Sequence, residues 1–219
     1  MNELSTLQLI AIWILPVIFA ITLHEAGHGW AAFKLGDNTA HQLGRITLNP
    51  IKHIDPIGTV ILPSLLLIFT GFVFGWAKPV PVNFQQLNQP RRDMALVALA
   101  GPGANLLMLF FWAIIINIGF FFYSSYDSAI FFIYAGQAGV MINFILMLLN
   151  LLPILPLDGG RVVHAMLPLN MADKYGKLEP FGIIVLIVLL LTGVLQQVMQ
   201  YFFGFIQIIL QNLIFINLN

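Results

Sequence analysis

An apolar run from Leu7 to about Phe33 is the feature that most restricts how this chain can fold. It is long enough to cross a bilayer as a helix, which takes about 20 residues, yet its second half carries His24, Glu25 and His28. Ionisable groups at membrane depth are costly unless they are paired or bind an ion. The run therefore predicts a membrane helix that carries a functional site.

The spacing of these three residues predicts a metal site. On a helix, His24 and His28 project from the same face, close enough to share one ion. Glu25 lies beside them and can accept a proton from an attacking water. Such a pattern also occurs by chance in soluble chains, but this sequence has only nine acidic residues and five histidines. Three of them within one apolar helix favour a metal site over coincidence.

Composition places the whole chain in the membrane. Of its 219 residues, 59% are hydrophobic and 8% are charged, whereas soluble domains have about 25% charged residues. The formal net charge of zero argues against a nucleic-acid partner, and the lack of cysteine leaves nitrogen and oxygen as metal ligands. We expect residues 1–219 to form a single membrane-embedded domain with the lipid bilayer around it.

Further apolar runs predict an all-α polytopic membrane protein. Residues 94–122 and 129–152 are long enough to span, and residues 180–203 form another candidate span. Residues 204–218 are short for a full crossing, so an interfacial or half-depth helix is an alternative. We expect about five to six transmembrane helices, with a catalytic core over about residues 7–168 and C-terminal helices over residues 180–218.

The run from Ile57 to Trp76 is long enough to cross but is interrupted by glycine and proline. If it crosses, Lys34 and Lys78 lie on opposite sides, whereas a re-entrant hairpin puts all nine Lys and Arg residues on one side. The second arrangement obeys the positive-inside rule better. We therefore expect a re-entrant segment after the first helix, although the sequence leaves open whether it is helical or strand-like. Backbone at this depth must pack on protein or line a wet cavity, so the segment should border the site.

The same topology supplies a third metal ligand. Two prolines and two glycines surround Asp158 after the 129–152 span. With a re-entrant segment, Asp158 lies on the same side as His24 and His28, whereas a crossing segment would put it on the opposite side. We expect these three residues to bind Zn2+ toward the cytoplasmic half of the membrane. Three protein ligands with an open fourth position are typical of catalytic zinc.

Several other polar residues have two interpretations. Asn150 precedes Asp158 by eight residues and is either a donor to a developing oxyanion or a helix-end hydrogen bond. Asn105 is expected to form an interhelical hydrogen bond rather than to take part in catalysis. The extended segment at Pro79 and Pro81 is either an edge for an unwound peptide or a plain loop. The sequence leaves open the roles of three further histidines, His41, His53 and His164.

Two motifs in this order resemble those of the site-2 protease family of intramembrane zinc metalloproteases. They are His24-Glu25-Ala26-Gly27-His28 and the stretch NLLPILPLDGG from Asn150 to Gly160, with membrane spans between them. Ala100-Gly101-Pro102 and Asn105 are similar to that family too. Residues 44–83 resemble its compact prokaryotic branch.

The resemblance covers about residues 20–165. It implies that His24, His28 and Asp158 bind zinc, that Glu25 is the general base, and that the protein cleaves transmembrane protein substrates in regulated intramembrane proteolysis. It also implies a multi-pass protein of a prokaryotic cell (inner) membrane. No PDZ-like or nucleotide-binding module is recognisable, and the sequence leaves open the substrate, the trigger and whether the chain forms a homo-oligomer.

Two other classes of function compete with an enzyme. A metal transporter would need several acidic or histidine positions along a path across the membrane, and the sequence has one such cluster. A non-catalytic membrane scaffold would not need a complete set of ligands and a base. Both alternatives are therefore less favoured than a zinc endopeptidase.

Overall fold

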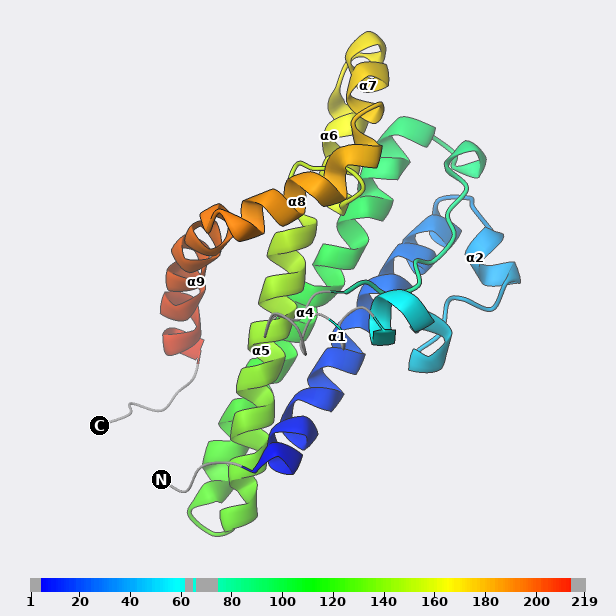
Figure 1. The fold of residues 1–219 in the computed structure, drawn as a ribbon. Coiled ribbons are helices and arrows are strands. Elements are labelled where there is room, and N and C mark those ends of the chain that lie inside the picture. The colour runs from blue at the N-terminus through cyan, green and yellow to red at the C-terminus, as the bar shows by residue number, and fades with distance from the viewer. Residues whose placement is uncertain (1–4, 62–64, 66–74, 214–219) are drawn as a thin grey trace.

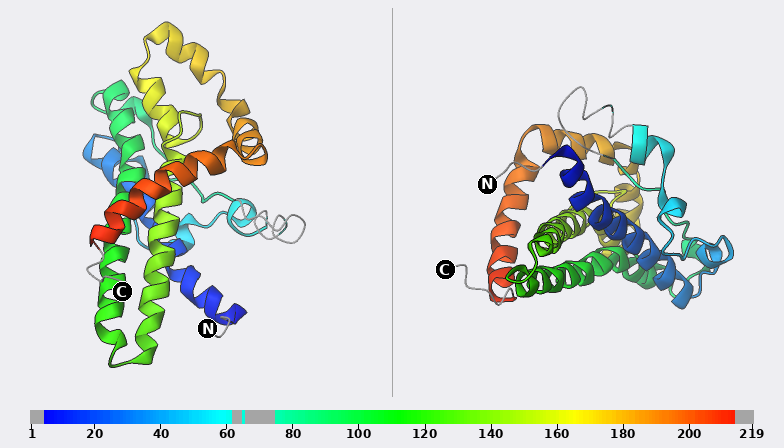
Figure 2. Two further views of the ribbon diagram at one scale, coloured as in Figure 1. Left: turned by 90° about the vertical axis from the view of Figure 1, so that its left-hand side faces the viewer. Right: turned by 90° about the horizontal axis from the view of Figure 1, so that it is seen from below.

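Three long helices form the centre of the protein. The computed structural model describes residues 5–61, 65 and 75–213. The central helices are α1 (Thr6–Lys34), α4 (Pro90–Tyr123) and α5 (Ile130–Asn150), the last preceded by the short turn η4 (Asp127–Ala129). Each is long and apolar enough to cross a membrane. Figures 1 and 2 show them packed side by side, with α4 antiparallel to α1 and α5.

Helix starts follow local sequence signals. The Ser5 hydroxyl accepts a hydrogen bond from the Gln8 N–H, and the Gln8 side chain accepts one from the Ser5 N–H, which is a capping box for α1. Pro90 opens α4, where the missing N–H has no helical partner to lose. Pro16 and Pro102 lie inside α1 and α4, as membrane helices tolerate when neighbouring groups satisfy the freed carbonyl.

Glycines let α4 and α5 pack closely. A Cβ on Gly136 would lie 2.5 Å from Ile116 Cγ1, and one on Gly139 would overlap the Trp112 ring. These contacts belong to the largest apolar core, which also contains Leu109, Ile133 and Phe144. Helices α4 and α5 are therefore closely packed, and α1, which carries the histidines, packs against them.

The chain leaves α1 and enters α4 at the same end of the helix layer. The Asn88 N–H donates to the Leu35 carbonyl over 2.9 Å, and the Asn83 N–H donates to the Asp37 carboxylate over 2.7 Å. The described residues of the connection contain α2 (Thr39–Gln42), η1 (Pro50–His53), η2 (Pro56–Ile61) and η3 (Phe84–Gln86).

The expected re-entrant segment, residues 57–76, lies largely outside the described residues. Its two described ends meet, because the Trp76 N–H donates to the Gly58 carbonyl over 3.0 Å and the Thr59 hydroxyl donates to the Trp76 carbonyl over 2.8 Å. A side chain on Gly58 would overlap the Trp76 indole. Residues 58 and 59 therefore lie next to residue 76 in the structure.

The C-terminal third is less regular than the sequence suggested. Beyond α5 come α6 (Asp158–Met166), α7 (Leu169–Gly176), η5 (Glu179–Phe181), α8 (Gly182–Leu191) and α9 (Val194–Leu213). Residues 180–203 do not form one straight helix, since α8 ends before Gly193 (φ 77°) and the chain bends there by 75°. Glycine in the left-handed region is a common helix terminator. Figure 2 shows α8 and α9 on the outside of the central helices.

The number of spans is smaller than expected among the described residues. Three helices are long and apolar enough to cross, or four if the bent α8–α9 pair counts as one span, against the five to six predicted. No strand occurs in the ranges that the structure describes. The fold is therefore all-helical with at least three candidate spans.

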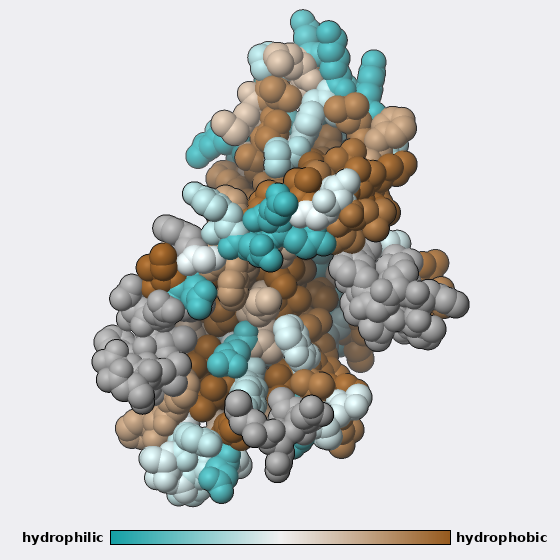
Figure 3. Space-filling model, turned by 60° about the vertical axis from the view of Figure 1, so that its left-hand side comes forward, coloured by the Kyte–Doolittle hydropathy of each residue, from teal (hydrophilic) through white to brown (hydrophobic). Residues whose placement is uncertain are grey.

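The surface is typical of a membrane protein. Leu7, Leu107 and Phe121 are each more than 70% exposed on the long helices. On the face in Figure 3, hydrophobic side chains cover broad areas, and hydrophilic side chains gather at the upper end and in a patch part-way down. An apolar exterior of this extent is stable in lipid rather than in water.

Candidate metal centre

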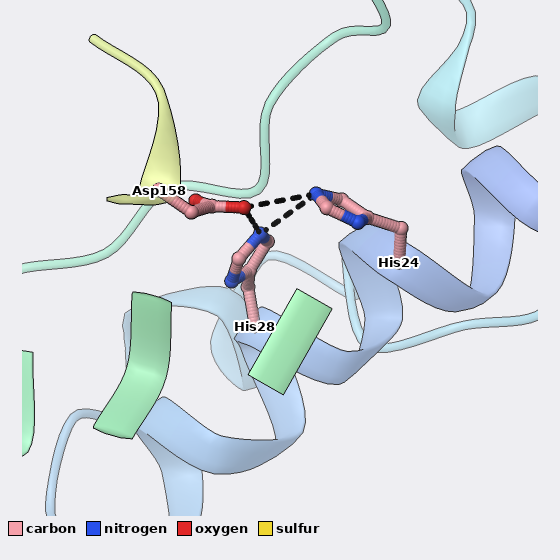
Figure 4. A group of neighbouring side chains, drawn as sticks. All are labelled: His24, His28 and Asp158. Carbon is pink, nitrogen blue, oxygen red and sulfur yellow. Dashed lines mark hydrogen bonds and ion pairs between the residues drawn. The ribbon is translucent and has the colours of Figure 1, made fainter. Parts of the chain in front are cut away.

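Three side chains from two helices meet at one point. The Nε2 atoms of His24 and His28 lie 3.1 Å apart, and each lies 3.3 Å from Asp158 Oδ2. Figure 4 shows both imidazoles projecting from α1 toward the carboxylate at the start of α6. His24 and Asp158 are buried and His28 is half-buried. The three residues that the sequence predicted as ligands are therefore brought together.

Hydrogen bonds on the far side of each ring fix the tautomers of the two histidines. His24 Nδ1 lies 2.6 Å from Asn105 Oδ1, and His28 Nδ1 lies 2.8 Å from the Val97 carbonyl oxygen. Both oxygens are acceptors, so each Nδ1 carries the hydrogen when the ring is neutral. Each Nε2 then presents a lone pair to the common point, as metal-ligating histidines do.

The three facing atoms fit a zinc ion. The Asp158 Oδ2 atom is buried and has no hydrogen bond, although both Nε2 atoms are close, because neutral imidazoles of this tautomer offer it no proton. Three lone pairs crowded together repel unless a cation lies between them. Zinc–ligand distances of about 2.0–2.1 Å give tetrahedral edges of about 3.3–3.4 Å, and the observed edges are 3.1 and 3.3 Å.

The chain turn before α6 presents Asp158 to the histidines. A Cβ on Gly159 or Gly160 would overlap the backbone of residues 151–155, so these glycines let the turn fold directly onto α6. A carboxylate that binds zinc must be ionised, and the turn holds Asp158 where its Oδ2 atom faces both imidazole nitrogens at 3.3 Å.

Helix α4 closes the other side of the centre. A Cβ on Gly101 would lie 2.5 Å from Cε1 of His28 and 2.7 Å from Cε1 of His24, and one on Gly27 would lie 2.9 Å from the Ala100 carbonyl oxygen. The absence of side chains at Gly27 and Gly101 lets α1 and α4 approach with both imidazoles between them.

The candidate base is held by the backbone of the extended segment. Glu25 Oε2 accepts a hydrogen bond from the Val80 N–H over 2.8 Å. Val80 is 7% exposed, and its Cγ1 would lie 3.1 Å from a Cβ on Gly29. The small residue at this position of α1 therefore lets residues around Val80 lie against the helix beside the carboxylate.

Comparison with known proteins identifies the family. The family model described as Peptidase family M50 matches residues 12–193, which is most of the chain. The chain belongs to peptidase family M50. It is 38% identical over 195 residues to "Putative zinc metalloprotease YwhC" of Bacillus subtilis (strain 168), a match that covers 85% of this chain and 83% of that protein.

More distant relatives carry a similar name. The M50 chain is 28% identical over 212 residues to "Putative zinc metalloprotease Rip2" of Mycolicibacterium smegmatis, across 93% of this chain and 78% of that protein. It is 29% identical to the Rip2 protein of Mycobacterium tuberculosis (strain H37Rv), across 90% of this chain and 70% of that protein. No solved structure matches the chain.

In this M50 protein the backbone of the extended segment is largely occupied. The Lys78 N–H donates to the His53 carbonyl, and the Arg45 guanidinium donates to the carbonyls of Lys78 (2.9 Å) and Pro79 (3.2 Å). The Val80 N–H is bonded to the base, and the prolines at 79 and 81 have no N–H. No N–H in residues 78–81 remains to pair with a substrate strand. Strand addition at these residues would therefore rest on carbonyl groups alone.

The other polar residues named from the sequence make contacts of their own in the structure. Asn150 donates from Nδ2 to the Leu146 carbonyl one turn earlier in α5. His41 stacks on Phe33, and His53 is buried with Nε2 3.0 Å from the Thr47 carbonyl oxygen. His164 lies beside Tyr175, with ring centroids 6.5 Å apart. Among these histidines the structure shows packing and hydrogen bonding rather than a second cluster of ligands.

Three groups around the centre were not predicted as parts of it. Asn143 contacts Asn105 across helices, the Val97 carbonyl accepts from His28, and Gly101 makes room for both rings. A polar side chain within an apolar span indicates a functional position in a sequence, and Asn105 and Asn143 both lie in such spans. A backbone carbonyl gives no such signal in a sequence.

Proposed function

We propose that this M50 protein is a zinc-dependent intramembrane endopeptidase of the site-2 protease type. The observation that carries the proposal is the triangle of His24 Nε2, His28 Nε2 and Asp158 Oδ2, formed on an apolar helix long enough to span. A catalytic centre on a membrane-spanning helix is accessible to membrane-embedded peptides rather than to soluble substrates. The substrate class is therefore a peptide segment of another membrane protein.

The roles of the site residues follow from their contacts. His24, His28 and Asp158 would hold the metal, and zinc bound there would polarise the scissile carbonyl and lower the pKa of a coordinated water to about 7. Glu25 accepts the proton of the attacking water and delivers it to the leaving amine. The Val80 N–H fixes one oxygen of Glu25, which leaves the other free for that proton.

Asn150 is the proposed donor to the developing oxyanion. Its Nδ2 uses one hydrogen on the Leu146 carbonyl, and the amide has a second hydrogen to donate. Such donors are worth about 2.7–4 kcal/mol in the transition state of other enzymes. The bond to Leu146 would hold the amide in place between turnovers.

We propose that residues 57–76 turn back without crossing and that the site faces the cytoplasm of a prokaryotic cell. The end of α1, the start of α4 and the end of α5 share one end of the helix layer. The nine Lys and Arg residues all lie near this end in the sequence. Lys34 is the last residue of α1, three others lie between α1 and α4, two lie in the first turn of α4, and three follow α5. They therefore share one face, which the positive-inside rule makes the cytoplasmic one.

The catalytic unit is one chain. His24 and Glu25 come from α1, Asn105 from α4, Asn150 from α5 and Asp158 from α6, so no second copy has to complete the site. We propose a single membrane-embedded domain over residues 1–219, with the catalytic core at about 7–168. A metal transporter is less favoured, because the described residues contain one group of potential ligands and not a series across the membrane.

Cleavage of a single-span model protein by the purified, reconstituted chain tests this function. The native chain is expected to cut within the span, with the position read by mass spectrometry. Glu25→Gln is expected to lose about 10²–10⁴-fold in rate while still binding zinc. Glu179→Gln is the matched control, since that carboxylate is half-exposed and pairs with Arg161 rather than with a ligand or the base. Equal cleavage by the native chain and Glu25→Gln would refute the proposal.

A further inference from the structure

Two amides are buried inside the helix layer behind the metal centre. Asn105 on α4 and Asn143 on α5 are both completely buried. An amide moved from water to apolar surroundings without hydrogen bonds costs roughly 2–7 kcal/mol. Both side chains must therefore be hydrogen-bonded, and the identity of their partners determines which way each amide points.

The partners form one chain of hydrogen bonds with a single direction. Asn143 Nδ2 donates to the Gly139 carbonyl over 2.8 Å. Asn105 Nδ2 donates to Asn143 Oδ1 over 2.9 Å and to the Ala20 carbonyl over 3.1 Å. Both hydrogens of the Asn105 amide are thereby used, and its Oδ1 is left to face His24 Nδ1 at 2.6 Å.

Backbone carbonyls determine this direction because they can only accept. A flipped Asn105 would place its oxygen against the Ala20 carbonyl, and a flipped Asn143 would do the same against Gly139. Since neither flip is compatible with a buried acceptor, Asn105 Oδ1 must accept from His24. The proton on His24 is then fixed at Nδ1, and its Nε2 lone pair faces Asp158.

We propose that Asn105 and Asn143 are positioning residues for the zinc ligand His24. Asn105 holds the imidazole in the metal-binding tautomer, and Asn143 holds the Asn105 amide in the required orientation from a third helix. The proposal rests on the proposed zinc site but assigns these residues no contact with substrate. Zinc affinity is accordingly coupled to the packing of α1, α4 and α5.

His28 provides an internal comparison. Its Nδ1 lies against the Val97 backbone carbonyl, an acceptor that no side-chain substitution removes. A change at position 105 or 143 should therefore disturb the His24 tautomer and leave the His28 tautomer in place. A general loss of structure would disturb both rings.

The experiment measures zinc affinity of the full-length, purified chain by competition with a chelator. Asn105→Leu is expected to bind zinc about 10–100-fold more weakly than the native chain, the range for loss of a hydrogen bond to a ligating histidine. Asn143→Leu is expected to show a smaller loss, because the Ala20 carbonyl still orients Asn105. Asn117→Leu, on the same helix as Asn105, is the matched control and should bind zinc like the native chain.

Nitrogen NMR of histidine-labelled, metal-free protein measures the tautomer of each histidine. A purely structural role of Asn105 would not change the tautomer of His24 alone. In Asn105→Leu the His24 signal should shift toward the Nε2–H tautomer while the His28 signal stays unchanged. Asn105→Asp covers the case in which the leucine variant does not fold. Its carboxyl keeps an oxygen acceptor for His24 Nδ1, so it should retain more zinc affinity than the leucine variant.

The outcomes separate this inference from the proposed function. Asn105→Leu binding zinc within twofold of the native chain, or an unchanged His24 tautomer, would overturn the positioning role and leave the protease proposal intact. Asn105→Asp binding no better than Asn105→Leu would also count against it. A native chain that binds no zinc would instead overturn the proposed function, and the positioning role with it.

Discussion

Replacing Gly101 by alanine tests the close approach of α4 to the two histidines. The added methyl group would lie 2.5 Å from Cε1 of His28 and 2.7 Å from Cε1 of His24, whereas ordinary contacts are 3.4–4 Å. One or both rings must therefore move by about 0.7–0.9 Å. Zinc–ligand distances tolerate about 0.2 Å, so the three donor atoms can no longer meet one ion.

The expected loss is large in activity and in metal binding. A displacement of about 1 Å at a reacting centre costs roughly 100-fold in rate, and we expect at least that loss of cleavage by Gly101→Ala together with weakened zinc binding. The substitution is otherwise favourable, because alanine in a helix interior is about 0.5–1 kcal/mol better than glycine. A loss of function without a loss of helix is the signature to look for.

Gly103→Ala is the matched control two residues further along α4. A Cβ there has no atom within 4 Å, so its cleavage rate and zinc affinity should equal those of the native chain. Both variants are assayed for cleavage of the model span, for zinc by chelator competition, and for thermal unfolding. Native zinc affinity in Gly101→Ala would refute the placement of the imidazoles against α4.

Three further substitutions test other contacts. Asp158→Asn replaces a carboxylate ligand by a neutral amide and is expected to lower zinc affinity about 100-fold or more. Competition with a chelator measures this affinity, and an unchanged value would exclude Asp158 as a ligand. Val80→Pro replaces the N–H that Glu25 accepts by a ring carbon, so cleavage should fall at least about tenfold with zinc content unchanged. Val80→Ile keeps the N–H and should keep the native rate. Equal rates in both would show that this bond does not orient the base. Gly193→Ala places alanine at φ 77° and should lower the free energy of unfolding by about 1–2 kcal/mol; an unchanged unfolding midpoint would contradict the helix break at that residue.

The candidate metal ligands were predictable because their geometry follows from short-range rules and from topology. His24 and His28 share a face through helical periodicity alone. Asp158 follows His28 by 130 residues, and the charge distribution across the predicted crossings indicated that it returns to the same side. In the structure these three side chains lie together, as the sequence pattern predicted.

The surroundings of the ligands were less predictable, because they depend on how the helices rotate about their axes. Asn105 was expected to form an interhelical hydrogen bond, and it does so with Asn143, but its contact with His24 depends on the facing of α4 toward α1. The fit of Gly101 against both rings depends on the same facing. Such rotations are determined by tertiary packing and are not encoded in local pattern.

Hydropathy alone was least informative in the C-terminal third. Residues 180–203 are largely apolar, which predicts one span, whereas α8 ends at Leu191 and the chain bends before α9. The Thr-Gly pair was a stop signal of the kind that terminates helices, and the apolar flanks obscured it. Most of the 57–76 segment lies outside the described residues, so its re-entrant course stays a prediction.

Zinc titration of the metal-free protein tests the central claim most directly. The purified chain is stripped with a chelator, reconstituted in lipid with the single-span substrate, and supplied with zinc in steps while cleavage and bound zinc are measured together. The account predicts that cleavage rises in proportion to bound zinc and saturates at about one ion per chain. Full cleavage by protein that retains no zinc, or zinc binding that restores no cleavage, would contradict it.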